Sequence, residues 1–357
     1  MKQPLELQQM HSDGGAIDIQ PVVSTAKVPR IAALDFTKGA LVLFMVLYHW
    51  INYFIGSEWP YYRYLRFLTP SFIFITGFMI SNVYLSKYEV TDPRLLKRLV
   101  VRGFKLVIIF TVLNLARDCV RPLLSGGDVD FSTLHLKNIQ VIFLTGDFTS
   151  KIVAFYILVP IAYLLVLSGL LMLPRRKYKY TFQAFSAFLF LLLATIDLSG
   201  RKNQNLEILA IGMLGILVGF KRIEIINRVI RHPYLLAFAY LLYTIAITIW
   251  NVPYPFEIVG TCLTVTIIYL VGTIDWRLRT IQGKVIHLGK YSLFGYIAQI
   301  AILQILEAGL RHVSLNYATL FISLVVAVGL TVMSVEMVDR ARKGASLVDG
   351  LYKVLFN

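Results

Sequence analysis

Long apolar runs, repeatedly about 18 residues or more, recur between short polar segments, and runs of this length match the thickness of a bilayer. The runs are apolar on all sides, so their length is more informative than any amphipathic stripe. They lie near residues 36–56, 67–86, 103–116, 151–173, 180–198, 206–220, 234–250, 257–274, 291–310 and 317–337. This pattern predicts an all-α fold, a polytopic membrane helix bundle with about ten transmembrane helices.

The basic residues indicate how these helices are oriented. With the N-terminus in the cytoplasm, the predicted cytoplasmic segments hold 26 of the 35 lysines and arginines. Positive residues favour the cytoplasmic side of a membrane. If the helix count were wrong by one, half of the basic clusters would lie on the outer side. We therefore predict that both termini are cytoplasmic and that the protein lies in the cytoplasmic (inner) membrane. The longest outer loop is expected at about 117–150, with a re-entrant or interfacial stretch near 138–146.

The composition agrees with this class of protein. Apolar residues make up 57% of the chain and charged residues only 15%, whereas a soluble domain carries about a quarter charged residues. The net charge of +15 sits in short clusters between the apolar runs, which favours contact with membrane lipid over nucleic acid. We expect a disordered cytoplasmic tail at 1–29, one membrane domain at 30–337 and a cytoplasmic tail at 338–357.

The first predicted helix carries ionisable residues on one face. Lys38 and His49 are eleven positions apart, which places both on the same side of a helix, separated by an axial rise of about 16 Å. Asp35 and Asn52 belong to the same stripe. In one interpretation Lys38 extends to the interface and His49 bonds a neighbouring carbonyl. For His49 we favour a functional role, because ionisable residues at that depth are costly.

A basic stripe follows the second run. Residues 91–93 (Thr-Asp-Pro) are typical of a helix start, and Arg94, Arg98, Arg102 and Lys105 recur after it at helical spacing. Arginine donors form bidentate contacts with phosphate groups, so the stripe would suit a phosphorylated ligand. The alternative is an anchor on anionic lipid, which is the better interpretation of the stripe taken in isolation.

Smaller polar signals occur elsewhere. Tyr296 and Gln299 lie one turn apart on the ninth predicted helix, where they either line a pocket or form hydrogen bonds between helices. Cysteine and histidine do not cluster at metal-ligand spacing, so no metal is expected. A set of glycines is expected to permit close helix packing rather than chemistry: Gly77, Gly212, Gly215 and Gly219.

Four segments, in order, resemble the membrane acyltransferase superfamily that includes the acyltransferase-3 proteins, the glucan succinyltransferases and the heparan-glucosaminide acetyltransferase type. Residues 30–49 (RIAALDFTKGALVLFMVLYH) look like its first-helix signature, an Arg-Gly pair with ten residues between the Arg and a His. Residues 72–78 (FIFITGF) resemble its "F-x-x-S-G-F", and 97–102 (KRLVVR) resemble the basic pair that follows. Residues 288–296 (LGKYSLFGY) resemble its late "L-G-x-x-S-L-x-x-Y" segment.

The chain departs from this family pattern at two positions. The signature Arg is Lys38 here, so a bidentate anion contact becomes a point charge. In many relatives the late segment continues to a His where this chain has Gln299, so a role in proton transfer is not expected at that position.

The resemblance implies transfer of an acyl group, such as acetyl or succinyl, from a cytoplasmic donor such as acyl-CoA to an outer acceptor such as a glycan. A pantetheine arm of about 15–20 Å would reach from phosphates at the stripe to His49. His49 would act as general base or briefly carry the acyl group. His49 and Lys38 are thus the predicted catalytic residues, and the predicted binding residues are Asp35, Asn52, Arg94, Arg98, Arg102, Lys105, Tyr296 and Gln299.

Two other functions stay open. In the first, the chain is a transporter or lipid-binding protein without transferase activity, and Lys38, Asp35 and His49 form a relay or substrate site. In the second, it is a non-catalytic membrane component that kept the fold after losing the signature Arg. The lack of a visible internal repeat argues against a transporter.

Overall fold

A computed structural model describes residues 31–56, 60–85, 92–125, 131–146, 153–175, 177–221, 223–250, 254–274, 276–310 and 316–356. Every regular element in these ranges is helical, with η marking 3₁₀ or π turns: α1 (Ala32–Phe54), η1 (Pro60–Leu65), α2 (Leu68–Met79), η2 (Ile80–Tyr84), α4 (Pro93–Ser125), η3 (Ser132–Leu134), α5 (Leu136–Gln140), η4 (Val141–Thr145), α6 (Leu158–Arg175), α7 (Thr181–Leu198), α8 (Gln204–Gly219), α9 (Ile223–Val229), α10 (Pro233–Ile249), α11 (Tyr254–Thr273), α12 (Arg279–Lys290), α13 (Ser292–Leu310), α14 (Tyr317–Gly344) and α15 (Ser346–Phe356).

The ten predicted apolar runs coincide with helices. In the described part of the chain, eight helices are long and apolar enough to cross a membrane, and α8 and α10, of 16 and 17 residues, are apolar but shorter. The short stretch near 138–146 is the helical pair α5–η4, which is too short to span. The predicted class of multi-pass, all-α membrane protein is confirmed, while the side that each end faces stays a prediction.

α4 is longer than the sequence suggested, with 33 residues. It joins the basic stripe to the third apolar run and continues to Ser125, so the predicted loop from residue 117 is wrong over its first part. The charges that ended the apolar run are paired: Arg117 Nη2 lies 2.6 Å from Asp118 Oδ1, and Thr133 Oγ1 donates to Asp118 Oδ2 at 2.6 Å. Because both charged side chains have partners, α4 continues beyond residues 117 and 118 without a break.

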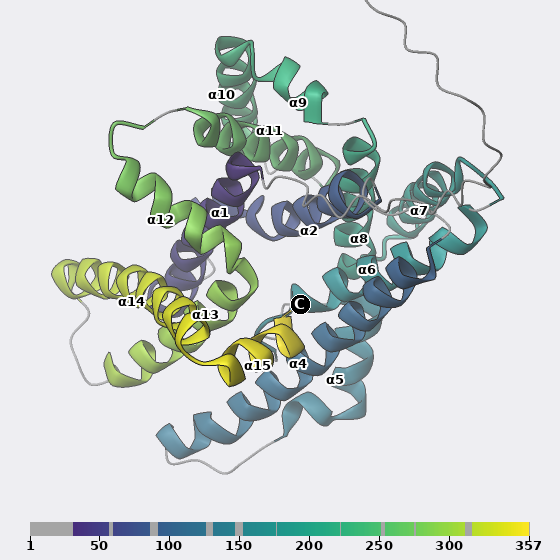
Figure 1. Cartoon of the computed structure of the whole chain (residues 1–357). Coiled ribbons are helices and arrows are strands. Elements are labelled where there is room, and N and C mark those ends of the chain that lie inside the picture. The colour runs from purple at the N-terminus through teal and green to yellow at the C-terminus, as the bar shows by residue number, and fades with distance from the viewer. Residues whose placement is uncertain are drawn as a thin grey trace, which may run out of the picture.

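α1 lies among α2, α11, α12, α13 and α14 (Figure 1). Its closest neighbour is α12, because glycines let the two backbones touch. A Cβ at Gly39 would lie 1.9 Å from the carbonyl oxygen of Val285, and one at Gly289 would lie 1.7 Å from that of Asp35. Gly289 belongs to the late LGKYSLFGY segment, so close packing explains that motif position.

α2 and α8 are joined by a second set of glycines. A Cβ at Gly77 would lie 2.0 Å from the carbonyl oxygen of Gly212, and one at Gly215 would lie 2.1 Å from that of Phe74. The predicted packing role of these glycines is confirmed. α8 also packs on α6 and α7, and α4 runs along α6, so α4 to α8 form a second group of helices beside α2 (Figure 1).

The chain after the last apolar run returns to the bundle. α14 continues to Gly344, and α15 follows after Ala345 and packs on α14. In Figure 1 α15 (yellow) crosses between the group around α1 and the group containing α4. The predicted boundary at 337/338 thus lies inside α14. The predicted tail at 1–29 lies outside the described residues.

Candidate functional site

The polar face of α1 begins with an ion pair. Lys38 Nζ lies 2.6 Å from Asp35 Oδ1, and the two side chains are only 19% and 9% exposed. Asp35 sits in the first helical turn, where the helix dipole also favours a negative charge. Lys38 therefore lies in the bundle as a paired cation. Since α1 is continuous from Ala32 to Phe54, His49 is on the same face as Lys38, about 16 Å further along the axis.

α13 runs beside α1 in the same direction. Gly295 faces Val42 near the middle of α1. Further along both helices, Gln304 Nε2 donates to Tyr53 Oη at 3.1 Å. Gln299 lies between these two contacts on α13, so it is at the depth of the second half of α1, where His49 lies. The predicted residues of the first and ninth helices are therefore brought together.

Tyr296 is the centre of an aromatic group next to His49. Its ring centroid lies 6.3 Å from that of His49, 6.2 Å from Phe72 of α2 and 6.4 Å from Phe155 before α6. Phe155 has a φ of 57°, a left-handed conformation that is costly for a bulky side chain. The neighbouring Ala154 holds this segment in place, because its N–H donates to Asn114 Oδ1 at 2.8 Å and its carbonyl oxygen accepts from Asn114 Nδ2 at 3.0 Å.

Two polar side chains in this region have buried atoms that lack a partner. Within the described residues, Nε2 of His49 and both amide atoms of Gln299 make no hydrogen bond, and Gln299 is fully buried. Such atoms are rare in folded proteins, because an unsatisfied buried polar group costs about 1–3 kcal/mol. Asn52, one turn beyond His49, is half-buried on the same helix. The arrangement can bind a ligand that both donates and accepts hydrogen bonds.

The basic stripe forms as predicted on α4. The Asp92 side chain accepts a hydrogen bond from the backbone N–H of Arg94 at 2.8 Å, which confirms the predicted helix start. Arg94 and Arg98 are exposed, whereas Arg102 and Lys105 are half-buried. Arg102 Nη1 donates to Tyr84 Oη at 2.7 Å, and the Arg98 guanidinium lies 5.6 Å from the centre of the Tyr84 ring. The stripe thus contacts Tyr84 in η2, which continues α2 beyond the motif at 72–78.

Residues between the stripe and His49 come from α2 and α15. Phe72, which contacts Tyr296, packs in one apolar cluster with Val42 of α1 and Tyr352 of α15. Burial raises the pKa of Tyr352, and the nearby guanidinium groups of Arg342 and Arg102 oppose that rise. Sequence reasoning missed Tyr352 and Tyr84, and it gave Phe72 only as part of the 72–78 motif, without a place at the site. The only signal for Tyr352 was the helical spacing of apolar residues in the tail.

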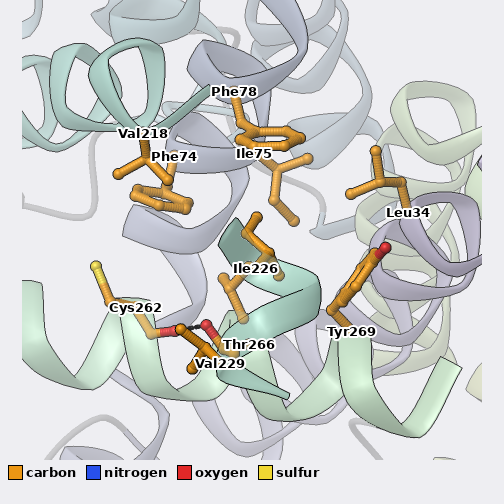
Figure 2. A pocket seen from close by; sticks show the side chains of 11 residues that line it. Leu34, Phe74, Ile75, Phe78, Val218, Ile226, Val229, Cys262, Thr266 and Tyr269 are labelled. Carbon is orange, nitrogen blue, oxygen red and sulfur yellow. Dashed lines mark hydrogen bonds between the residues drawn. The ribbon is translucent and has the colours of Figure 1, made fainter. Parts of the chain in front are cut away.

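A separate apolar cavity of about 170 Å³ lies near the start of α1, between α2, α9 and α11 (Figure 2). Leu34, Phe78 and Ile226 are among the side chains that line it. Its two hydroxyl groups are engaged, since Thr266 donates to the carbonyl oxygen of Cys262 at 2.7 Å and Tyr269 to Asn227 at 3.2 Å. The lining contains one thiol, that of Cys262, but no histidine, carboxylate or cation that would activate it, so the group around His49 stays the better candidate site.

No three His, Cys, Asp or Glu side chains gather into a metal-binding group in the part of the chain that the structure describes. Comparison with known proteins gives one match. The acyltransferase domain model (Acyl_transf_3) matches residues 31–336, from α1 to within α14. No curated protein and no solved structure gives a significant match. The matched region covers most of the chain and contains every candidate site residue. The resemblance drawn from four short motifs is confirmed, and the chain belongs to the acyltransferase-3 family.

Proposed function

We propose that this protein moves an acyl group, such as acetyl or succinyl, from cytoplasmic acyl-CoA to an acceptor on the outer side of the inner membrane, with a glycan as the acceptor class. The family match and the apolar helices support a membrane acyltransferase. The observation that carries the proposal is the buried group around Tyr296, in which His49 and Gln299 have polar atoms without partners.

In the proposed reaction the acceptor hydroxyl or amine attacks the carbonyl carbon of the thioester. Neutral His49 accepts the proton of the attacking group at Nε2, which makes no hydrogen bond among the described residues. The carbon–sulfur bond then breaks, and the CoA thiolate takes the proton from the imidazolium. The products are the acylated acceptor and CoA with a free thiol, so the proton count balances.

Gln299 is proposed to stabilise the charge that develops on the thioester oxygen. Its amide N–H groups can donate to that oxygen, and its Oε1 can accept the remaining N–H when the attacking group is an amine. A donor held in a water-poor bundle stabilises a developing oxyanion strongly. Tyr296 fixes the imidazole through ring contact and separates it from Phe72 and Phe155.

The donor phosphates are proposed to bind at the stripe of α4. Arg94 and Arg98 are exposed and can meet phosphate groups directly, and Arg102 lies deeper beside Tyr84. Lys38 would then lie along the path of the pantetheine arm as the partner of Asp35. The alternative role of the stripe, an anchor on anionic lipid, predicts no loss of donor binding when it is removed.

The proposal is tested with purified protein in detergent, which exposes both faces. Acetyl-CoA or succinyl-CoA is incubated with a panel of oligosaccharides, and the release of CoA thiol is measured together with the acylated sugar. We expect thiol release that depends on an oligosaccharide. Binding of the CoA ester without thiol release in any mixture would favour the transporter or lipid-binding alternative.

A second measurement tests the donor site. We expect Arg98→Ala with Arg102→Ala to weaken CoA binding about tenfold or more, and added salt to weaken it further. The matched control is Arg228→Ala with Arg231→Ala, which removes two exposed arginines on the same predicted side. Equal CoA affinity in both double variants would assign the stripe to lipid anchoring.

A further inference from the structure

α15 has an outer face that is apolar and exposed. Leu347, Leu351, Val354 and Leu355 recur at i, i+4, i+7 and i+8, and they are 78%, 57%, 63% and 42% exposed. An exposed apolar face at helical spacing on an 11-residue helix is typical of a helix that lies on a surface. Such a face needs a partner surface that shields its apolar side chains from water.

The depth of α15 follows from its contacts. The Tyr352 ring lies 5.5 Å from that of Tyr291, directly before α13, and the Phe356 ring lies 6.0 Å from that of Phe294, in the first turn of α13. α13 is one of the helices long and apolar enough to span the bilayer. α15 therefore lies at the level where α13 enters the membrane, which is the boundary between headgroups and acyl chains.

The outer face of α15 adjoins surfaces that already face lipid. On α14, Met333 and Met337 are 56% and 66% exposed. α15 follows α14 after the single residue Ala345, and its Tyr352 lies near Arg102 of α4. The apolar face thus follows directly on the exposed apolar side chains of the spanning helix α14.

The inner side of α15 is fixed, so the outer face cannot rotate inward. Arg342 donates from Nε and Nη2 to Asp349 Oδ1 at 2.9 and 2.7 Å, and its guanidinium lies 4.0 Å from the centre of the Tyr352 ring. We call these three residues the α14–α15 latch. Two exposed cations lie at the same end of α14, each beside a carboxylate of the same helix: Arg340, 82% exposed, is 3.9 Å from Glu336, and Lys343, 75% exposed, is 2.6 Å from Asp339.

From this geometry we propose that α15 is an interfacial helix, docked by Leu347, Leu351, Val354 and Leu355 on the cytoplasmic leaflet of an anionic bilayer. The apolar side chains would enter the acyl region, and the exposed cations of α14 would meet lipid phosphates. The latch sets which face of the helix meets the lipid. The inference concerns the membrane contact alone and stands whether or not the protein transfers acyl groups.

The test uses the full chain in nanodiscs that contain phosphatidylglycerol. A fluorophore is attached to Leu351→Cys in a background of Cys119→Ala and Cys262→Ala, and quenching by lipids with a nitroxide near the acyl boundary is measured. The matched control is Ser346→Cys on the same helix, which is exposed but off the apolar face. We expect several-fold stronger quenching at 351 than at 346.

A second readout does not depend on the label. Leu351→Asp with Val354→Asp should speed amide exchange in 346–356 by about tenfold, because charged groups cannot enter the acyl region, whereas Ser346→Asp should not. Equal quenching at 351 and 346 would overturn the proposal. A disulfide between two copies through Leu351→Cys, without quenching by lipid, would overturn it in favour of a second copy as the partner.

Discussion

The group around His49 and the α14–α15 latch use polar side chains in opposite ways. In the latch, the guanidinium of Arg342 is bonded twice to Asp349 and stacked on Tyr352, and Lys353 lies 2.5 Å from the other oxygen of Asp349. At the site, Nε2 of His49 and both amide atoms of Gln299 are buried without a partner in the described residues.

This difference separates two kinds of polar residue in one membrane protein. A polar group whose bonds are complete stabilises the fold, and removing one partner leaves the other unsatisfied. A buried group whose bonds are incomplete costs stability, and a ligand or catalytic role is one explanation for its presence. Substitutions should therefore have opposite effects at the two regions, and the following predictions test that contrast.

The largest effect is expected at His49. His49→Gln keeps a polar side chain of similar size but no base, so transfer should fall by about 100-fold or more. The melting temperature should stay near that of the parent, because Nε2 makes no bond within the described residues whose loss would destabilise the fold. Acyl transfer and thermal unfolding of the purified variant are measured together. The control is Tyr48→Phe, which removes a hydroxyl but keeps the ring that lies 5.2 Å from the His49 ring.

Transfer by His49→Gln at close to the parent rate would remove the proposed mechanism. It would favour a transporter or a structural protein, because neither needs a base at this position. Loss of folding in the same variant would show that His49 belongs with the satisfied residues of the latch.

A smaller and more diagnostic effect is expected at Gln299. Gln299→Met preserves the volume and removes two unsatisfied polar atoms, so stability should be equal or higher by about 1–3 kcal/mol. Transfer should fall about tenfold, which corresponds to one hydrogen bond lost in the transition state. Thermal unfolding tests the expected stability, and initial rates test the expected loss of transfer. A destabilised variant with unchanged kinetics would contradict the assignment.

The docking of α15 by the latch should depend on pH. Lys353 and Arg342 hold the pKa of Asp349 below its usual value near 3.9. A lowered pKa contributes stability above the unfolded value, and this contribution is lost as the pH falls through the folded pKa. The pKa of Tyr352 is raised, mainly by burial, so its contribution is lost above about pH 10.

We therefore expect α15 to stay docked between about pH 5 and 9 and to loosen outside this range. A nitroxide on Ser346→Cys, in the background without native cysteines, reports this as increased mobility. Asp349→Asn should abolish the acid transition and leave the alkaline one, and Tyr352→Phe should do the reverse. A single transition unaffected by either substitution would show that other groups control the docking.

The sequence predicted the features that are local. Run length identified the helices, and the spacing of Lys38 and His49 placed them on one face, because both follow from the geometry of a single helix. The end of α4 was misjudged because the Arg117–Asp118 pair looks like a loop until Thr133, distant in sequence, is seen to bond it. Contacts between segments that are distant in sequence cannot be predicted from the spacing of residues within one segment.

The site also combines features that are local to one helix with features that depend on packing between helices. Tyr296 and Gln299 were found by a turn spacing and a family motif, and their depth relative to His49 could be known only from contacts such as Gln304 with Tyr53. Tyr352 could not be placed at all, since its position depends on α15 folding back onto α13. The absence of partners around Gln299 is likewise a property of the packed bundle.

The smallest effect is expected for Lys38→Arg, because Lys38 has a complete ion pair although it shares a face with His49. Lys38→Arg should keep the ion pair with Asp35 and restore the residue of related families, so transfer should stay within about twofold of the parent. Lys38→Met is the contrast, because it leaves the carboxylate of Asp35 buried and unpaired, a loss of about 3–5 kcal/mol. Arginine does not give up its proton in proteins, so the two variants also separate a fixed cation from a proton carrier. Rates and melting temperatures of both are compared with the parent. A tenfold or larger loss of rate in a stable Lys38→Arg would show that the amine itself transfers a proton and would move Lys38 into the class of His49.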